Sequence, residues 1–105
     1  MNLTYPTTLV LHALAVGIRH GFDIIDATGL PSGTVYPILR RLERETLVIA
    51  AWEDVEIARD EQRPPRRYYE LTASGASLVV VARTRYTVPK SVTARARRLR
   101  PASSS

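Results

Sequence analysis

The chain has 105 residues and a net charge of +5, with a sequence pI near 10.2, which suits one domain with a modest core and a polyanionic partner. Fourteen of its 15 basic residues are arginine, the side chain suited to bidentate contacts with phosphate and guanine. The absence of cysteine excludes disulfides, thiolate catalysis and cysteine-based zinc sites, and it fits a cytoplasmic protein.

The first predicted element is a helix that begins near residues 5–6 and ends at Gly17. Thr4 is its candidate N-cap, and Pro6 lies early enough for its missing N–H to cost little. Residues 9–16 are apolar on more than one face, so we expect a helix buried on several sides, in the core or against a second subunit. This run is too short to span a bilayer, and no basic segment precedes it as in a signal peptide.

A short helix over about 21–28 is predicted next, with Phe22, Ile24 and Ile25 as its core residues. Gly29 is expected to end this helix, and a turn with proline and glycine leads to a longer helix over 32–45. Two helices joined by a tight turn that contains glycine form a helix-turn-helix, whose second helix docks into the major groove of DNA.

The predicted helix over 32–45 has one apolar and one basic face. Spacing at i, i+3, i+4 and i+7 places four residues on the apolar face: Val35, Ile38, Leu39 and Leu42. Either Ser32 or Thr34 could cap the helix, and Pro37 is expected at the edge of the first turn. We predict that the other face binds DNA, with an ordinary solvated basic face as the alternative. The predicted contacts on this helix are Ser32, Gly33, Thr34, Tyr36, Pro37, Arg40, Arg41 and Arg44.

Two strand-like runs follow, over 47–52 and 66–71, joined by a polar connection with prolines over 53–65. A hairpin over 48–71 directly after a helix-turn-helix is interpreted as a wing. Half of the ten acidic residues of the chain lie within 53–61, so the tip is not a cationic finger. The predicted phosphate contacts at the return of the hairpin are Arg63, Arg66 and Arg67. Trp52 is expected to pack at the base of the wing, with ligand stacking as the alternative.

A further helix is predicted over about 73–86, capped by Thr72 or Ser74. Its valines at 79–81 would also suit a strand. The helix is apolar nearly all round, which favours a dimer interface over complete burial in one chain. The predicted interface residues are Leu9, Leu78, Val81, Ala82 and Tyr86.

Residues 83–100 contain seven basic residues and no acidic one. We therefore divide the chain into a DNA-binding domain over 1–88 and a flexible basic tail over 89–105 that adds non-specific phosphate affinity. The alternative for 91–100 is a short helix on an anionic surface. Pro89 breaks any continuing helix.

Signatures of catalysis or metal binding are missing from this sequence. It contains no Ser-His-Asp set, no paired catalytic carboxylates and no phosphate-cradling glycine loop, and no cysteine or carboxylate is grouped around His12 and His20. We therefore expect neither an enzyme nor a metal or cofactor protein.

Two motifs carry a family resemblance. Residues 33–43, GTVYPILRRLE, resemble the recognition-helix signature of the PadR family of bacterial transcriptional regulators. Residues 64–72, PPRRYYELT, followed by Gly75, resemble the return strand of that family's wing and the start of its last helix. The resemblance covers roughly residues 5 to 86. The chain departs from the family at Thr46, where the family commonly has glycine. A β-branched residue adopts the left-handed conformation of a helix stop poorly, so the exact end of the helix over 32–45 is left open.

The resemblance implies a mainly α-helical fold with a small β-hairpin, a winged helix-turn-helix. It also implies a homodimer, usually a repressor, in which the C-terminal helix and the first helix form the dimer, and some members bind a small effector near that interface. The short C-terminal region resembles a minimal member. Our hypothesis is a homodimeric repressor that inserts helix 32–45 into the major groove of an inverted-repeat operator. The alternatives are a non-specific architectural protein and a protein-interaction module on the same fold.

Overall fold

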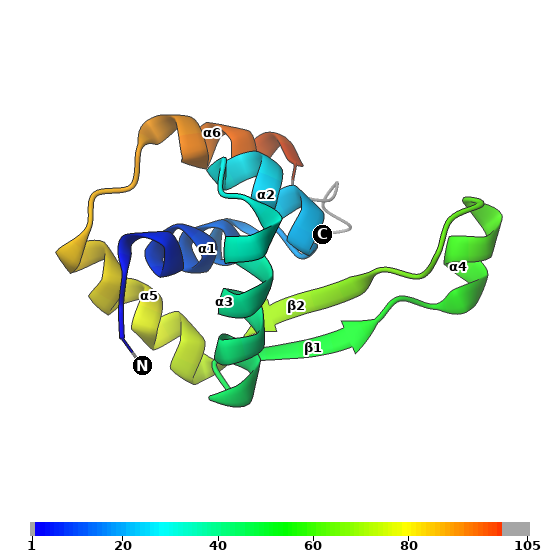
Figure 1. Cartoon of the computed structure of the whole chain (residues 1–105), viewed down its shortest axis with the longest axis horizontal. Coiled ribbons are helices and arrows are strands. Elements are labelled where there is room, and N and C mark those ends of the chain that lie inside the picture. The colour runs from blue at the N-terminus through cyan, green and yellow to red at the C-terminus, as the bar shows by residue number, and fades with distance from the viewer. Residues whose placement is uncertain (1, 100–105) are drawn as a thin grey trace.

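The structure is a computed structural model that describes residues 2–99. Three helices come first, then a hairpin that carries a helix at its tip, then two more helices (Figure 1). The predicted mainly helical fold with one hairpin after three helices is confirmed. The elements are α1 Tyr5–Val16, α2 Gly21–Thr28, α3 Ser32–Arg44, β1 Val48–Trp52, α4 Val55–Asp60, β2 Arg67–Leu71, α5 Ala73–Arg85 and α6 Lys90–Leu99.

Helix α1 lies at the centre of the molecule. The side chain of Thr4 accepts a hydrogen bond from the Thr7 N–H at 3.2 Å, and Gly17 ends the helix in the left-handed conformation with φ 115°. Because α1 packs against α2, α3, α5, α6 and β2, its apolar residues are buried on several sides, as predicted.

Helix α2 turns a different face to the core than the sequence suggested. Ile24 is fully buried and Ile25 half-buried, but Phe22 is 77% exposed. The prediction of a buried Phe22 is wrong, because the core face runs through Ile24 and Ala27 and a residue two positions from Ile24 lies on the opposite side of the helix. Gly29 ends α2 with φ 74°, as predicted.

Helix α3 buries the predicted apolar stripe of Val35, Ile38, Leu39 and Leu42. Its N-cap is Pro31, with no side-chain hydrogen bond, so the prediction that Ser32 or Thr34 caps the helix is wrong. The reason is that the helix already includes Ser32 and Thr34, since the Pro31 carbonyl accepts the N–H groups of Thr34 and Val35 at 2.9 and 3.1 Å. Pro37 consequently lies inside the helix, in its second turn.

The end of α3 uses a left-handed residue at Thr46, with φ 57°. The Thr46 N–H donates to the Glu43 carbonyl at 3.0 Å, and the Leu47 N–H donates to the Leu42 carbonyl at 2.9 Å. This pair of bonds is a Schellman motif with threonine in the place usually taken by glycine. The departure noted in the sequence therefore falls on a position that does need a left-handed conformation.

The segment predicted as a polar connection, residues 53–65, contains the helix α4. Strands β1 and β2 pair antiparallel, with Val48 opposite Leu71 and Trp52 opposite Arg67. Beyond them, the Asp54 side chain caps α4 by accepting the Glu56 N–H at 2.8 Å. The hairpin projects away from the helical body, with α4 at its far end (Figure 1).

The segment whose valines would also have suited a strand forms the helix α5. Thr72 caps it by accepting the Gly75 N–H at 3.1 Å. Gly75 allows a close approach of the chain to itself, because a Cβ there would lie 2.0 Å from the Leu47 carbonyl oxygen. Val79 faces the core, whereas Val80 is 64% exposed and Val81 is also exposed.

Helix α6 corrects the prediction of a flexible tail over 89–105. Residues 90–99 form a helix that packs on α1 and α2 and buries Val92 and Ala96. His12 of α1 also holds it. The Nε2 atom of His12 lies 2.7 Å from the Thr93 hydroxyl oxygen, and its Nδ1 atom lies 3.0 Å from a guanidinium nitrogen of Arg83.

These contacts define the state of His12. Burial, Arg83 and Arg97 all lower the pKa of His12, so the ring is neutral near pH 7. Because Arg83 can only donate, His12 Nδ1 accepts and Nε2 carries the proton donated to Thr93. Residues 100–105 of the predicted tail lie outside the described residues.

Candidate DNA-binding surface

The side of α3 opposite the core presents most of the predicted DNA contacts to solvent. Ser32, Gly33, Arg40, Arg41 and Arg44 are exposed, and Thr34, Tyr36 and Pro37 are half-buried. Within residues 2–99, none of the three arginines takes part in a salt bridge. Their guanidinium groups are therefore available for an external anion.

A groove of about 610 Å³ separates this part of α3 from the wing, lined by Arg40, Glu43, Arg44, Arg67 and Tyr69. Arg67 crosses the groove, and its Nη2 atom donates to Glu43 Oε1 at 3.0 Å. The same guanidinium lies 5.2 Å from the centre of the Trp52 ring, within reach of a cation–π interaction. Arg67 thus ties the wing to α3 and still lines the groove.

The prediction that Trp52 packs at the base of the wing is wrong. Trp52 ends β1 on the side away from the helical body, and it is 66% exposed. The base of the wing is filled instead by Val48, at the start of the strand.

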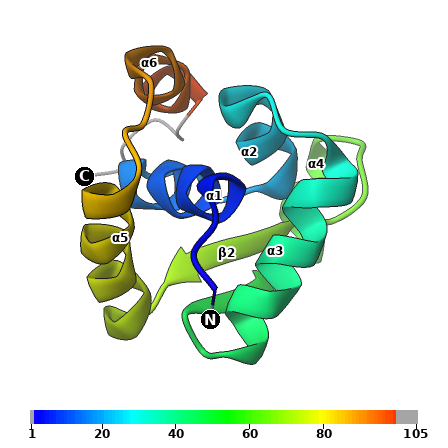
Figure 2. The same ribbon diagram turned by 60° about the vertical axis from the view of Figure 1, so that its left-hand side comes forward.

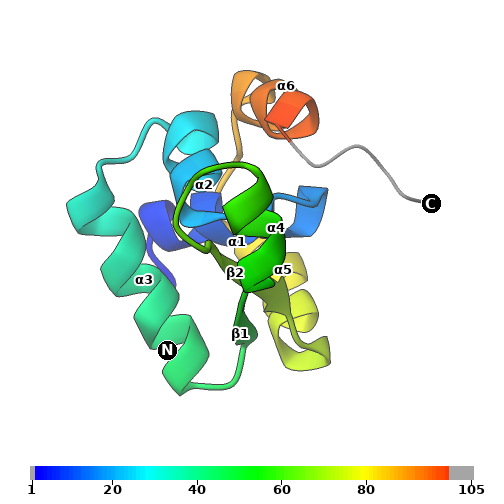
Figure 3. The ribbon, with the colours of Figure 1, turned by 90° about the vertical axis from the view of Figure 1, so that its right-hand side faces the viewer.

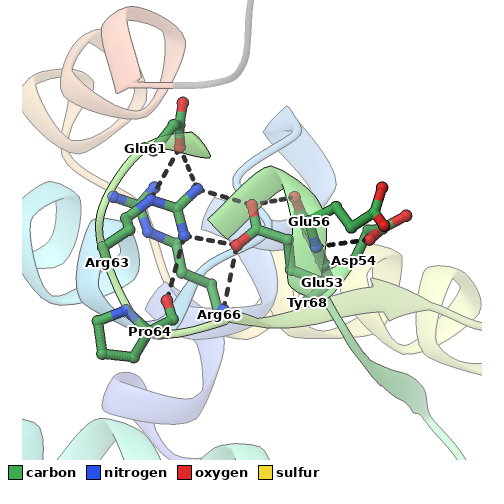
Figure 4. Close-up of polar contacts among 8 residues, drawn as sticks. All are labelled: Glu53, Asp54, Glu56, Glu61, Arg63, Pro64, Arg66 and Tyr68. Atoms are coloured by element: carbon green, nitrogen blue, oxygen red, sulfur yellow. Dashed lines mark hydrogen bonds and ion pairs between the residues drawn. The ribbon is translucent and has the colours of Figure 1, made fainter. Parts of the chain in front are cut away.

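Arg63 has a structural role that the sequence analysis did not predict (Figure 4). Its guanidinium donates to both carboxylate oxygens of Glu53, at 2.7 Å from Nη2, and to Glu61. The Glu53 side chain is only 2% exposed. Because its charge is satisfied inside the wing, Arg63 is removed from the set of predicted phosphate contacts.

The carboxylate of Glu53 organises the base of the wing tip. Besides Arg63, it accepts the backbone N–H of Arg66 at 3.3 Å and the hydroxyl of Tyr68 at 3.2 Å. These donors, led by Arg63, outweigh burial and lower the pKa of Glu53 to about 2. A buried carboxylate with this many donors remains ionised at neutral pH.

Arg66, directly before β2, lines a cavity of about 450 Å³ between α2, α3 and the wing, and Arg67 lines the same cavity. Tyr36 reaches the same cavity and packs so closely on α2 that a Cβ at Gly21 would lie 2.6 Å from its ring. The exposed Phe22 also lines this cavity.

His20 also lines this cavity. Its ring centre lies 4.5 Å from that of Tyr68, and its buried Nδ1 atom has no hydrogen-bond partner among the described residues. Burial, followed by Arg66, lowers the pKa of His20. Sequence reasoning missed Gly21, Phe22 and His20, since the only signal was the place of these residues at the start of a predicted helix.

The residues predicted for a dimer interface divide into two groups. Leu9 and Ala82 are 4% and 1% exposed in the single chain, so they have almost no surface to offer a partner, and the prediction for them is withdrawn. Val81 is exposed, Leu78 is half-buried, and the half-buried Tyr86 ring lies 5.9 Å from that of Tyr5. The exposed Val80 was not predicted and adds to this surface.

Residues 2–99 contain no cluster of three or more histidine, cysteine or acidic side chains that could hold a metal ion. Over the same residues, no helix combines the length and apolar character needed to cross a membrane.

Comparison with known proteins identifies the family. Residues 10–79 match the model of the "Transcriptional regulator PadR-like family". Among solved structures, a PadR-like transcription factor from Bacteroides fragilis is 27% identical with a TM-score of 0.56, over 73% of this chain and 77% of that one. No curated protein matches the chain. The chain therefore belongs to the PadR-like family of transcriptional regulators, a family of winged helix-turn-helix proteins and not of enzymes.

Proposed function

We propose that this regulator is a homodimeric repressor that places α3 in the major groove of an inverted-repeat operator. The observation that carries the proposal is the exposed side of α3, where Arg40, Arg41 and Arg44 have no salt bridge within residues 2–99. Arginine on a recognition helix is suited to bidentate guanine contacts or to phosphate. The groove beside α3 gives the duplex backbone a place next to the wing.

The amino end of α3 supports the same orientation. Ser32 and Gly33 are exposed there, and the first N–H groups of a helix attract phosphate. Since no side chain caps α3, the N–H groups of Ser32 and Gly33 stay available. Arg66, beside the half-buried Tyr36, adds a second anchor for the backbone.

The dimer is proposed to form through α5. Val80 and Val81 are adjacent exposed apolar residues on a helix whose other side faces the core. Pairing this surface with a second copy would remove it from water and present α3 twice, which a two-fold symmetric operator requires.

The cavity between α2, α3 and the wing is the proposed site of a small-molecule effector. Its volume of about 450 Å³ and its lining of aromatic, proline and arginine side chains are typical of small-molecule sites. A ligand there would contact Tyr36 and Arg66, both proposed DNA contacts, and would therefore weaken operator binding. A thermal-shift screen with and without operator DNA tests this, since a ligand that stabilises the protein without competing with DNA would contradict it.

Selection of bound sequences from a random DNA pool, repeated at two salt concentrations, tests the main proposal. We expect an enriched inverted repeat with half-sites about one helical turn apart. Arg40→Ala and Arg44→Ala should each weaken binding to that sequence. Loss of a base contact should cost about 1–3 kcal/mol of binding free energy. Loss of a phosphate contact should lower the slope of log affinity against log salt concentration by about 1.

The matched control is Arg59→Ala. Arg59 is exposed on α4, away from α3, so its loss should leave operator affinity unchanged. Enrichment of no sequence, or equal effects of all three variants, would contradict the proposal and favour non-specific binding.

A further inference from the structure

Charge is divided unevenly along this chain. The wing tip, defined as residues 53–63, has five acidic and two basic residues, a net charge of −3. Residues 71–105 have seven basic residues and no acidic one, a net charge of +7. The two segments form separate parts of the structure, since the wing tip includes α4 and the basic segment includes α5 and α6.

The wing tip has the surface of a protein contact. Val55 and Ile57 of α4 are exposed, as is Trp52 at the end of β1. Asp54, Glu56 and Asp60 are exposed beside them. Large apolar side chains at the end of a projecting arm indicate an interaction site, and the net negative charge disfavours DNA phosphates as its partner.

The tip is also held in place, so docking requires little further ordering. The buried Glu53 binds Arg63, which also binds Glu61, and these contacts join the two ends of the segment that carries α4 (Figure 4). A surface fixed in advance loses less conformational entropy on binding.

The most complementary surface on the chain is that of α6. Lys90, Arg95, Arg97 and Arg98 are exposed on it, and no acidic residue lies within the helix. The basic surface of α3, by contrast, includes Glu43 and Glu45 among its arginines. Arginine also suits the apolar part of the tip, because its stem covers aliphatic groups and its guanidinium stacks on tryptophan.

The positions of these surfaces separate the contact from DNA binding. Helix α6 packs on α1 and α2, on the side of them away from α3, while the wing tip projects from the body (Figures 2 and 3). The tip extends away from the α6 of its own chain (Figure 1). The partner of the tip must therefore be another molecule.

We propose that the wing tip of one copy docks on α6 of a second copy, head to tail. The two surfaces differ, so the contact is heterologous and can extend into an open array. It uses neither the exposed side of α3 nor Val80 and Val81 of α5. Dimers of the kind proposed above would thereby assemble side by side while each keeps its DNA-binding surface free.

Sedimentation velocity of the full chain over a range of concentrations, at low and high salt, tests the proposal. We expect species larger than a dimer at low salt that revert to dimers at high salt, where exposed charges are screened. The tip variant Glu56→Lys with Asp60→Lys changes the net charge of the tip from −3 to +1, and the α6 variant Arg95→Glu with Arg97→Glu and Arg98→Glu changes that of α6 from +4 to −2. Each variant should require at least about tenfold more protein to assemble, since like charges would then face each other.

An equimolar mixture of the tip variant and the α6 variant is the decisive sample. Each reversed surface meets a complementary one in the mixture, so we expect assembly to return. Asp26→Lys with Glu70→Lys changes the net charge as the tip variant does but at exposed positions elsewhere, and it should assemble as the wild type does. Trp52→Ala, which changes no charge, should also weaken assembly.

Two outcomes would overturn the proposal: a wild-type protein that never exceeds the dimer at low salt, or a mixture that fails to assemble although both variants show wild-type thermal melts. Failure of the proposed α5 dimer can be distinguished from failure of the wing-tip contact. It would leave monomers at high salt, from which salt-sensitive growth through the tip would still occur.

Discussion

At the scale of single residues, Glu53 shows how one carboxylate can organise a projecting segment. It binds Arg63 of the return loop, the backbone N–H of Arg66 and the hydroxyl of Tyr68. The two strands of the wing thus share one buried charge. This arrangement couples the wing to pH, because the carboxylate must stay ionised to accept all of these bonds.

We predict that Glu53→Gln removes part of the pH dependence of stability. The folded-state pKa of Glu53 is depressed from 4.5 to about 2, so its stabilisation is complete above about pH 4.5 and is lost as the pH falls towards 2. The stability difference between wild type and variant, from chemical denaturation at several pH values, should therefore narrow from pH 5 to pH 2. Glu56→Gln, at an exposed carboxylate of the same segment, is the matched control. A constant difference for Glu53→Gln would contradict the buried ion pair.

Thr46 is a second residue with a local cost, because it takes a left-handed conformation at the end of α3. We predict that Thr46→Gly stabilises the protein by about 1 kcal/mol, since glycine adopts this conformation without steric cost. In a domain of this size the melting temperature should rise by about 4–8 °C. Thr46→Ala, which keeps a Cβ, should gain less, and an equal gain would show that the backbone is not the cause.

At the scale of elements, α6 changes the meaning of the basic C-terminal region. The helix buries Val92 and Ala96 on α1 and α2, and the contacts of Thr93 and Arg83 with His12 join α6 and α5 to α1. The segment therefore completes the core instead of only supplying charge.

Deletion of residues 89–105 is consequently predicted to destabilise the domain by at least about 2 kcal/mol, the scale of burying one or two aliphatic side chains. Deletion of residues 100–105 alone is the control, because it keeps α6 whole. Urea denaturation of both truncated proteins provides the measurement. Equal stability of the two truncated proteins would show that α6 does not contribute to the core. If deletion of residues 89–105 weakened DNA binding without lowering stability, the prediction of a flexible basic tail would be supported instead.

At the scale of the whole molecule, the exposed side chains divide into separate surfaces. The arginines of α3 are exposed without a salt bridge within residues 2–99, Val80 and Val81 are exposed on α5, and apolar side chains lie on the wing. Such a division permits DNA binding and association with other copies at the same time.

We predict that Val81→Asp weakens the proposed dimer about 100-fold, because a charge buried without a partner at an interface costs about 3 kcal/mol. Light scattering at high salt, where the wing-tip contact is screened, would give the mass. Ile49→Asp changes an equally apolar, exposed residue of the wing and should leave the dimer intact. A dimer that survives Val81→Asp would exclude α5 as the interface.

The sequence by itself determined the elements that depend on near neighbours. The apolar stripe of α3, the Thr4 and Thr72 caps, the glycine stop at Gly29 and the paired strands all follow from residues within about four positions of one another or from simple alternation. The PadR-like motifs lie in these same elements, which is why family and fold could be predicted.

Only the tertiary structure decided which of these residues remain available at the surface. The partner of Arg63 is ten residues away, and the Thr93 that binds His12 is 81 residues away, so no local pattern marks either pair. The apolar stripe of α6 is narrow and interrupted by arginines, and it indicates a packed helix only once α1 and α2 supply the opposite face. Burial of Leu9 and Ala82, and exposure of Phe22, likewise follow from which face each helix turns to the core, because hydrophobic burial depends on neighbours that only the folded chain brings together.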